Sequence, residues 1–322
     1  KRFSSVHGRQ SAMEVPTVRS ALGGLICMLL YVVLTISIPP DSFKCGVADC
    51  GVSGRNFEDL QSIPNGEQPR LGDFPWAVAL YKKNAETGLW EHYCGGTLIT
   101  PHIVLTAALC VVLKGSKRNT EDIQVGLGKV YYDYYHIEST AALLTVREVV
   151  VPDQYIGAQN KFKTDIALLD LDVDAQLSTA IRPACLDLSD NFHLRDNFTG
   201  FIVGWGMTEN GKRKEYLQWA RQRYLSYTPC LEKLKKEFSH IPTSDKSCII
   251  DTQGTSYSDQ WRGSAGSAFT TVRDGVHTVY GIIFSAVPFD FQTLLITDLT
   301  QEVHRTWIRD QCHRLTRNLT VG

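Results

Sequence analysis

The residues best suited to chemistry lie in a loop rich in glycine and serine and in a short acidic segment. The loop, Asp259–Phe269 (DQWRGSAGSAF), places Ser264 and Ser267 on either side of Ala265. The segment Asp165–Leu169 (DIALL) puts one carboxylate at the start of an apolar run. A serine becomes a nucleophile when an imidazole takes its proton and a carboxylate orients that imidazole. The sequence thus supplies a hydroxyl and a carboxylate for this chemistry. The third group that it requires is an imidazole.

Short β-rich runs separated by turn residues surround these groups. The runs are Trp76–Tyr81, Thr97–Ala107, Leu143–Val151, Ile166–Leu171, Phe201–Trp205 and Val276–Phe284. Strands at this spacing, without helices alternating between them, are typical of a sandwich or a barrel. One helix is expected near the end, over about 300–310, where Val303 and Trp307 stand one turn apart. The sequence therefore predicts an all-β domain that ends in a helix.

The composition is that of a globular protein and argues against some partners. The 322 residues are 43% hydrophobic, which is enough to bury a full core. The 33 basic and 34 acidic side chains leave a formal net charge of -1. This near-zero balance argues against nucleic acid or an acidic membrane as the partner. The sequence contains no metal cluster, phosphate loop or cofactor motif, so we predict no cofactor and no metal site.

The N-terminal region contains an uncharged apolar stretch, Ala21–Ile38. Met13 begins a short region before it, and Ser37 ends a pattern of small residues typical of a cleavage site. We interpret residues 13–37 as a signal peptide and residues 1–12 as additional upstream sequence. The stretch is also just long enough for an uncleaved type II anchor. The protein is then secreted, or it is a membrane-anchored ectodomain if the stretch is retained.

The cysteines indicate an oxidising compartment. Of the 9 cysteines, Cys27 would leave with a signal peptide. The others are Cys45, Cys50, Cys94, Cys110, Cys185, Cys230, Cys248 and Cys312. An even number behind a secretory signal predicts a disulfide framework and an extracellular location. Two N-x-[ST] sequons, at Asn197 and Asn318, are predicted glycosylation sites in the same compartment.

A series of motifs follows the order and spacing of one known family. They are Ile63–Gly66 (IPNG), Gly72–Trp76 (GDFPW), Tyr93–Ile99 (YCGGTLI), Val104–Cys110 (VLTAALC), Asp165–Leu169 (DIALL), Arg182–Leu186 (RPACL), Val203–Gly206 (VGWG), Asp259–Phe269 and Gly281–Ala286 (GIIFSA). Through them the chain resembles the trypsin/chymotrypsin-like serine proteases, peptidase family S1. The resemblance implies the chymotrypsin-like fold, in which two six-stranded β-barrels are followed by a C-terminal helix.

The resemblance also implies domain limits and disulfide pairs. The protease-like domain covers 63–311, with barrels at about 63–180 and 181–298, a cysteine-containing lead-in at 38–62 and a tail at 312–322. The family pairs the positions of Cys94 with Cys110, and those of Cys230 with Cys248. The position of Cys185 usually bonds to an upstream segment, so its partner is Cys45 or Cys50. Cys312 then takes the other one.

Two of the three positions that carry the family's chemistry hold other residue types here. Asp165 fills the carboxylate position, but Leu109 stands at the imidazole position and Ala265 at the nucleophile position. A leucine cannot accept a proton, and an alanine cannot attack a carbonyl carbon. His102 lies 7 residues before Leu109, which is ~23 Å along an extended strand and too far to replace the base. Gly263 remains at an oxyanion-hole position.

The family's activation cut also lacks its usual residues. Ser62 precedes Ile63, so a trypsin-like activator would find no basic residue at this junction. Ser264 stands where the family has the aspartate that pairs with the new N-terminal ammonium. We therefore expect no activating cut between Ser62 and Ile63, although Arg55 and Arg70 flank the junction and could be cut instead.

The specificity pocket is altered as well. Asp259 matches the acidic pocket base that selects Arg or Lys, but Trp261 replaces the neighbouring cysteine. We expect Asp259 to be an exposed or hydrogen-bonded loop residue. Phe284–Ala286 (FSA) replaces the family's Ser-Trp-Gly substrate ledge. Some relatives bind calcium in the loop that matches Lys129–Tyr135 (KVYYDYY), which has one acid here, so we predict no calcium site.

The sequence therefore predicts a non-catalytic, secreted serine protease homologue of the arthropod type. Such homologues act as cofactors, decoys or regulators of active proteases, in haemolymph immunity cascades or reproductive fluids. The expected partners are extracellular proteins, namely active proteases or their substrates or inhibitors. One alternative is a serine-type endopeptidase with residual or unconventional activity. Another is a membrane-anchored ectodomain, which depends on the fate of Ala21–Ile38.

Overall fold

The computed structural model describes most of the chain after residue 44. The described residues are 45, 47–56, 68–189, 193–207, 212–234, 236, 242–251, 261, 263–284 and 293–317. The chain divides into two compact units, Lys1–Ser42 and Phe43–Gly322, and the described residues all belong to the second. The expected signal peptide and the Ser62–Ile63 junction lie outside them. Within the described ranges, no helix has the length and apolar character needed to cross a membrane.

Six antiparallel strands form the first barrel. They are β1 (Ala77–Lys83), β2 (Trp90–Leu98), β3 (Ile103–Thr106), β6 (Ile123–Leu127), β7 (Ala142–Val150) and β8 (Ala167–Leu171). They close in the order β1-β2-β3-β8-β7-β6. The single run predicted at Thr97–Ala107 is wrong, because the chain turns between β2 and β3. That turn is closed by the Ile99 N–H, which donates to the Ile103 carbonyl at 3.0 Å.

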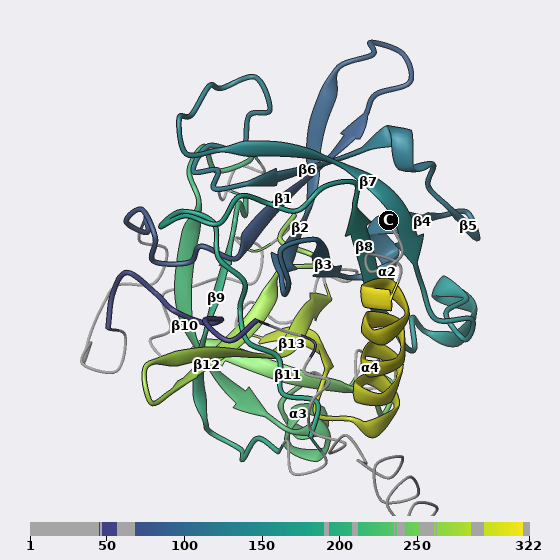
Figure 1. Ribbon diagram of the computed structural model, residues 1–322. Coiled ribbons are helices and arrows are strands. Elements are labelled where there is room, and N and C mark those ends of the chain that lie inside the picture. The colour runs from purple at the N-terminus through teal and green to yellow at the C-terminus, as the bar shows by residue number, and fades with distance from the viewer. Residues whose placement is uncertain are drawn as a thin grey trace, which may run out of the picture. The chain divides into compact units, whose positions relative to one another are not determined.

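Six further antiparallel strands form the second barrel. They are β9 (Thr199–Gly204), β10 (Gln218–Leu225), β11 (Lys246–Asp251), β12 (Ala268–Arg273), β13 (Val276–Phe284) and β14 (Thr293–Asp298). They close in the order β10-β11-β14-β13-β12-β9. Apolar and β-branched residues dominate both sets of strands, as expected for strands that bury one face in a barrel core. The predicted double β-barrel with a C-terminal helix is confirmed (Figure 1).

The C-terminal helix, α4 (Glu302–Arg317), continues beyond the predicted end near residue 310. Val303, one of the two apolar residues noted one turn apart, is 49% exposed. The buried residues are His304, Arg305, Ile308, Cys312 and Leu315. All but Arg305 recur at intervals of three or four residues along one side of the helix. Because this stripe runs past residue 310, the expected tail at 312–322 is helical as far as Arg317.

The shorter elements lie in the connections between strands. They are α2 (Ala108–Val111), β4 (Val112–Leu113), β5 (Ser116–Lys117), η2 (Thr120–Asp122), η3 (Gly157–Asn160) and α3 (Tyr227–Lys233). The one-turn helix α2 follows β3 directly and carries Leu109.

Disulfides fasten the outlying segments to the barrels. The pairs are Cys45–Cys312, Cys50–Cys185, Cys94–Cys110 and Cys230–Cys248. Of the two partners considered for Cys185, the structure has Cys50, and Cys45 is bonded to α4 through Cys312. The lead-in residues 47–56 also pair with β13 through the Val52–Val276 bridge. The lead-in is therefore held at both of its cysteines.

Aromatic rings pack where the two barrels meet. Phe74, just before β1, lies 5.9 Å from Trp219 of β10, measured between ring centroids. Trp76 lies 4.7 Å from the ring of His277 in β13. All four rings are buried. This packing fixes the barrels against each other, so that loops from both can meet at one site.

Candidate functional site

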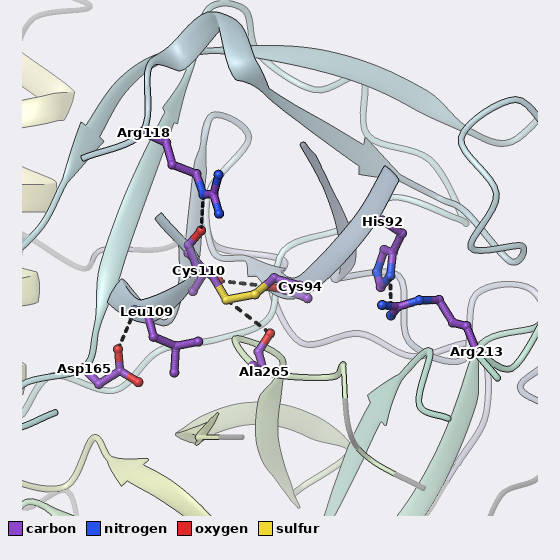
Figure 2. Close-up of a disulfide and its surroundings, with 10 residues drawn as sticks. His92, Cys94, Leu109, Cys110, Arg118, Asp165, Arg213 and Ala265 are labelled. Carbon is purple, nitrogen blue, oxygen red and sulfur yellow. Dashed lines mark hydrogen bonds between the residues drawn. A yellow bond between two sulfur atoms is a disulfide. The ribbon is translucent and has the colours of Figure 1, made fainter. Parts of the chain in front are cut away.

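The loop that carries Ala265 is fastened to the first barrel. The Gly95 N–H of β2 donates to the Ala265 carbonyl at 2.8 Å, and the Cys110 Sγ lies 3.6 Å from the same oxygen (Figure 2). Gly266 has a φ of +87°, and a Cβ there would clash with the Thr106 hydroxyl and the Gly95 carbonyl. Only glycine tolerates this conformation and this close approach. The loop therefore keeps a fixed position against β2 and β3.

Asp165 and Leu109 meet in front of this loop. The backbone N–H of Leu109 donates to Asp165 Oδ1 at 2.8 Å, as Figure 2 shows. Asp165 is fully buried, and the backbone N–H of Ala108 and the phenol of Tyr155 also act on its carboxylate. The short helix α2 turns the chain after β3 and brings the Leu109 N–H to the carboxylate. The structure thus joins the predicted carboxylate and imidazole positions through the backbone of Leu109.

The side chain of Leu109 packs into an apolar cluster. It is half-buried and contacts the cluster that contains Phe284 of β13. Phe162 packs against the same cluster, with its ring centroid 5.3 Å from that of Phe284. None of these three side chains can donate a hydrogen bond or carry a charge. The Leu109 side chain therefore adds to an apolar wall, while its backbone serves the carboxylate.

The buried carboxyl of Asp165 titrates far from its usual range. Burial raises its pKa from 3.8 to about 7, against the lowering effects of the Lys246 ammonium and the backbone N–H of Leu109. A carboxylate with few hydrogen bonds in a dry environment takes up a proton more readily than one in water. Asp165 therefore keeps its proton to a higher pH than an exposed aspartate does.

The two serines on either side of Ala265 are buried, and their hydroxyl groups point towards different glycines. Ser264 is 1% exposed, and its Oγ has no hydrogen-bond partner and faces Gly204. Ser267 is 3% exposed, and its hydroxyl points at Gly95 of β2. His102 lies at the opposite end of β3 from Leu109, and its Nδ1 is 3.5 Å from Asp174 Oδ1. Among the described residues, these hydroxyls and this imidazole do not come together.

A feature that the sequence did not predict lies beside Gly263. Gly263 has a φ of +89°, and a Cβ there would lie 2.7 Å from Nη1 of Arg213. The same Nη1 donates to Nδ1 of His92 at 2.8 Å, the contact drawn in Figure 2. Burial and then the charge of Arg213 lower the pKa of His92 well below its usual range, so its imidazole is neutral. A guanidinium therefore packs against the predicted oxyanion-hole glycine.

A comparison with known protein families identifies the family of this chain. Residues 63–288, well over half of the chain, match the sequence profile of the family described as Trypsin. The chain belongs to the trypsin family. The two six-stranded barrels and the C-terminal helix form the chymotrypsin-like fold.

Several proteins named for clotting or proteolysis are similar to this trypsin-family chain. Coagulation factor IX of Oryctolagus cuniculus is 29% identical over 71% of this chain and 77% of its own length. Clotting factor C of Tachypleus tridentatus is 28% identical over 54% of this chain, and modular serine protease of Drosophila melanogaster is 29% identical over 71%. The matches cover 17% and 37% of the latter two proteins.

The remaining predicted site residues have different outcomes. Asp259, Ser62, Ile63 and Asn318 lie outside the described residues. Asn197 is exposed just before β9, with a left-handed φ of 67°. Trp261 is 3% exposed and belongs to the main apolar core, and its carbonyl accepts the N–H of Ser264 at 3.0 Å. Arg55 is paired with Asp73 at 3.0 Å, whereas Arg70 is exposed.

The loop that binds calcium in some trypsin-family proteins contains a buried ammonium here. Lys129 Nζ lies 2.9 Å from Glu138 Oε1 and donates to the His136 carbonyl at 2.7 Å. The Glu138 carboxylate also accepts the Val130 N–H at 2.7 Å. Within the described residues, no group of three or more His, Cys, Asp and Glu side chains could hold a metal ion. The positive charge in this loop comes from the chain itself.

Proposed function

We propose that this trypsin-family chain is a non-catalytic, secreted protease homologue that acts by binding other proteins. The observation that carries the proposal is the pairing at Asp165. Its carboxylate accepts the Leu109 N–H at 2.8 Å, while the Leu109 side chain packs towards Phe284 and Phe162. In the described part of the chain, no imidazole contacts this carboxylate.

The chemistry explains why activity is not expected. In the triad mechanism the imidazole takes the proton of the serine as the serine attacks, and the carboxylate stabilises the resulting cation. Here a leucine and an alanine stand at the imidazole and serine positions. Because the triad acts as a unit, loss of one member costs about as much as loss of several, roughly a million-fold in turnover in the best-studied case. Ser264 and Ser267 are buried away from a base and do not supply a substitute.

The binding role is supported by what the chain retains. Both barrels close, and four disulfides hold the lead-in, the loops and α4 in place. These disulfides favour an extracellular location, since such bonds persist in oxidising compartments. Two of the relatives carry clotting in their names. We therefore infer that the partners belong to an extracellular protease cascade, as active proteases, substrates or inhibitors.

Activity is tested on the full chain purified from a secretory host. We expect no hydrolysis of arginine or lysine peptide substrates above buffer and no covalent labelling by a fluorophosphonate probe. Trypsin in the same assay shows that the reagents work. Labelling of the wild-type chain that is lost in Ser264→Ala or Ser267→Ala would overturn the proposal and identify the nucleophile. N-terminal sequencing of the secreted material tests whether the signal peptide is removed.

Binding is tested by affinity capture from the native extracellular fluid, followed by mass spectrometry. We expect recovery of trypsin-family proteases or of their inhibitors. Capture on the chain with its disulfides reduced provides the control, because it loses the folded surface. Recovery of no cascade component by the folded chain would contradict the regulatory role.

A further inference from the structure

We propose that Arg213 forms a carboxylate-binding site beside the loop of Ala265, and that its ligand is an acidic side chain of a partner protein. The inference rests on the proposed function, because it names the chemistry by which a non-catalytic chain recognises its partner. Three features carry it: the anchoring of the guanidinium, its uncompensated charge and its position against Gly263.

The guanidinium of Arg213 is anchored at one nitrogen. Its Nη1 donates to His92 Nδ1 at 2.8 Å and lies 3.4 Å from the Trp205 carbonyl oxygen. Its Nε and Nη2 have no hydrogen-bond partner among the described residues. Nε–H and Nη2–H form one edge of the planar group, and this edge can bind both oxygens of a carboxylate. The anchoring by Nη1 therefore leaves a fixed, unused fork.

The charge of this guanidinium is not neutralised by the part of the chain that the structure describes. Arg213 is half-buried, and none of the ion pairs among the described residues includes it. The titratable groups beside it are His92, which is neutral, and the phenol of Tyr132. Partial burial of an unpaired cation destabilises a protein, and an incoming carboxylate would remove that cost. The site therefore favours an anion.

The position of the site favours a protein ligand over a polyanionic polysaccharide. Arg213 packs against Gly263, two residues before Ala265 on the same loop. One recessed guanidinium recognises one planar carboxylate, whereas a sulfated polymer is bound by several exposed cations. Lys212 and Lys214 flank Arg213 along the chain, whereas the groups that act on its guanidinium are the neutral rings of His92 and Tyr132. An aspartate or glutamate of a partner protein fits this arrangement.

The probe for this site is a blocked peptide, acetyl-(Glu-Gly)3-amide, with acetyl-(Gln-Gly)3-amide as its uncharged counterpart. We expect the glutamate peptide to bind the full chain saturably and to shift the Arg213 Nε–H signal in nitrogen-15 NMR. Arg213→Gln weakens binding at least tenfold. Arg213→Lys, which keeps the charge but lacks the fork, weakens it to a similar extent. The glutamine peptide does not bind.

The matched control is Arg273→Gln, the same change at an exposed arginine on the β12–β13 turn. We expect it to alter the affinity less than twofold, and thermal unfolding of each variant shows that it is folded. The proposal is overturned if the glutamate peptide does not bind, or if Arg273→Gln weakens binding as much as Arg213→Gln. It is also overturned if a heparin fragment binds at Arg213 and the peptide does not. These results are independent of the hydrolysis and labelling assays, so each proposal fails separately.

Discussion

Asp165 and Asp245 are two buried carboxylates that influence each other electrostatically, yet their surroundings differ. Asp245 accepts the Thr164 N–H and the Lys246 ammonium, each at 2.8 Å, and lies 3.3 Å from Nε2 of His304. Asp165 accepts the Leu109 N–H with Oδ1, and the Ala108 N–H and the Tyr155 phenol also act on its carboxylate, but its contacts include no ammonium of the kind that pairs with Asp245.

Their pKa values move in opposite directions. Burial acts to raise the pKa of Asp245, but the His304 ring and the Lys246 ammonium outweigh it and hold that pKa well below its usual range. Burial of Asp165 is not compensated in this way, and its pKa rises to about 7. The difference teaches that the chain keeps the polar network that holds α4 and β11 together. By contrast, the side chain of Leu109, whose backbone N–H bonds to Asp165, packs into an apolar cluster.

The largest expected effect on stability follows from removing the Asp245 carboxylate, which has several hydrogen-bond partners. Asp245→Ala leaves the Lys246 ammonium, which is buried, without its ion pair. Breaking a buried pair by removing one partner costs about 3–5 kcal/mol. We expect the free energy of unfolding, measured by denaturant titration, to fall by about that amount. Asp274→Asn on the exposed β12–β13 turn is the control, and an equal effect there would refute the difference in roles.

The second expected effect is a gain in protein stability when Asp165 is replaced by asparagine. The folded state keeps this carboxyl protonated up to about pH 7, whereas the unfolded chain ionises near 3.8. Its contribution to stability therefore falls as the pH rises from about 4 to about 7 and stays low above that. Each unit of pKa difference corresponds to about 1.4 kcal/mol. We expect Asp165→Asn to stabilise the protein by roughly 2–4 kcal/mol at pH 8.

The measurement is the free energy of unfolding of both chains at pH 4, 6 and 8. The variant should gain progressively over the wild type as the pH rises, and the two should approach each other at pH 4. A variant that is less stable than the wild type at pH 8 would show that the Asp165 carboxylate is well compensated.

A smaller effect is expected at Lys129, whose ammonium pairs with Glu138. Lys129→Gln removes the charge but leaves the Glu138 carboxylate bonded to the Val130 N–H. We expect a loss of about 1–3 kcal/mol, the range for an unsatisfied buried polar group. Calcium or a chelator should not change the thermal midpoint of the wild type. Stabilisation by millimolar calcium would show that the loop binds the metal despite its internal ammonium.

Much of the fold and part of the site could be predicted from the sequence. The motif Val104–Cys110 places Leu109 after a strand, and the motif Asp165–Leu169 starts the neighbouring strand, so their meeting follows from strand order. The resemblance to the trypsin family implied the pairs Cys94–Cys110 and Cys230–Cys248, and the structure contains both. Such features can be predicted because strand pairing and disulfides link segments of the chain in a fixed register.

The contacts made by side chains from distant loops could not be predicted. Arg213 reaches His92 across 121 positions of the sequence. Gly263 gave a partial signal, since a glycine with positive φ often allows another group to approach closely. The packing of Phe162 against Phe284 depends on loop conformations that no periodicity specifies. The end of α4 was missed because polar residues stand between the buried Ile308, Cys312 and Leu315.

Titration of the Asp165 carboxyl by carbon-13 NMR tests the central claim most directly, with Asp165→Asn used to assign the signal. If apolar side chains have taken the place of the imidazole, the midpoint lies near pH 7, and Leu109→His lowers it by supplying a cation at the carboxylate. A midpoint near or below pH 4 in the wild type would contradict the account, because Asp165 would then have a polar partner that keeps it ionised.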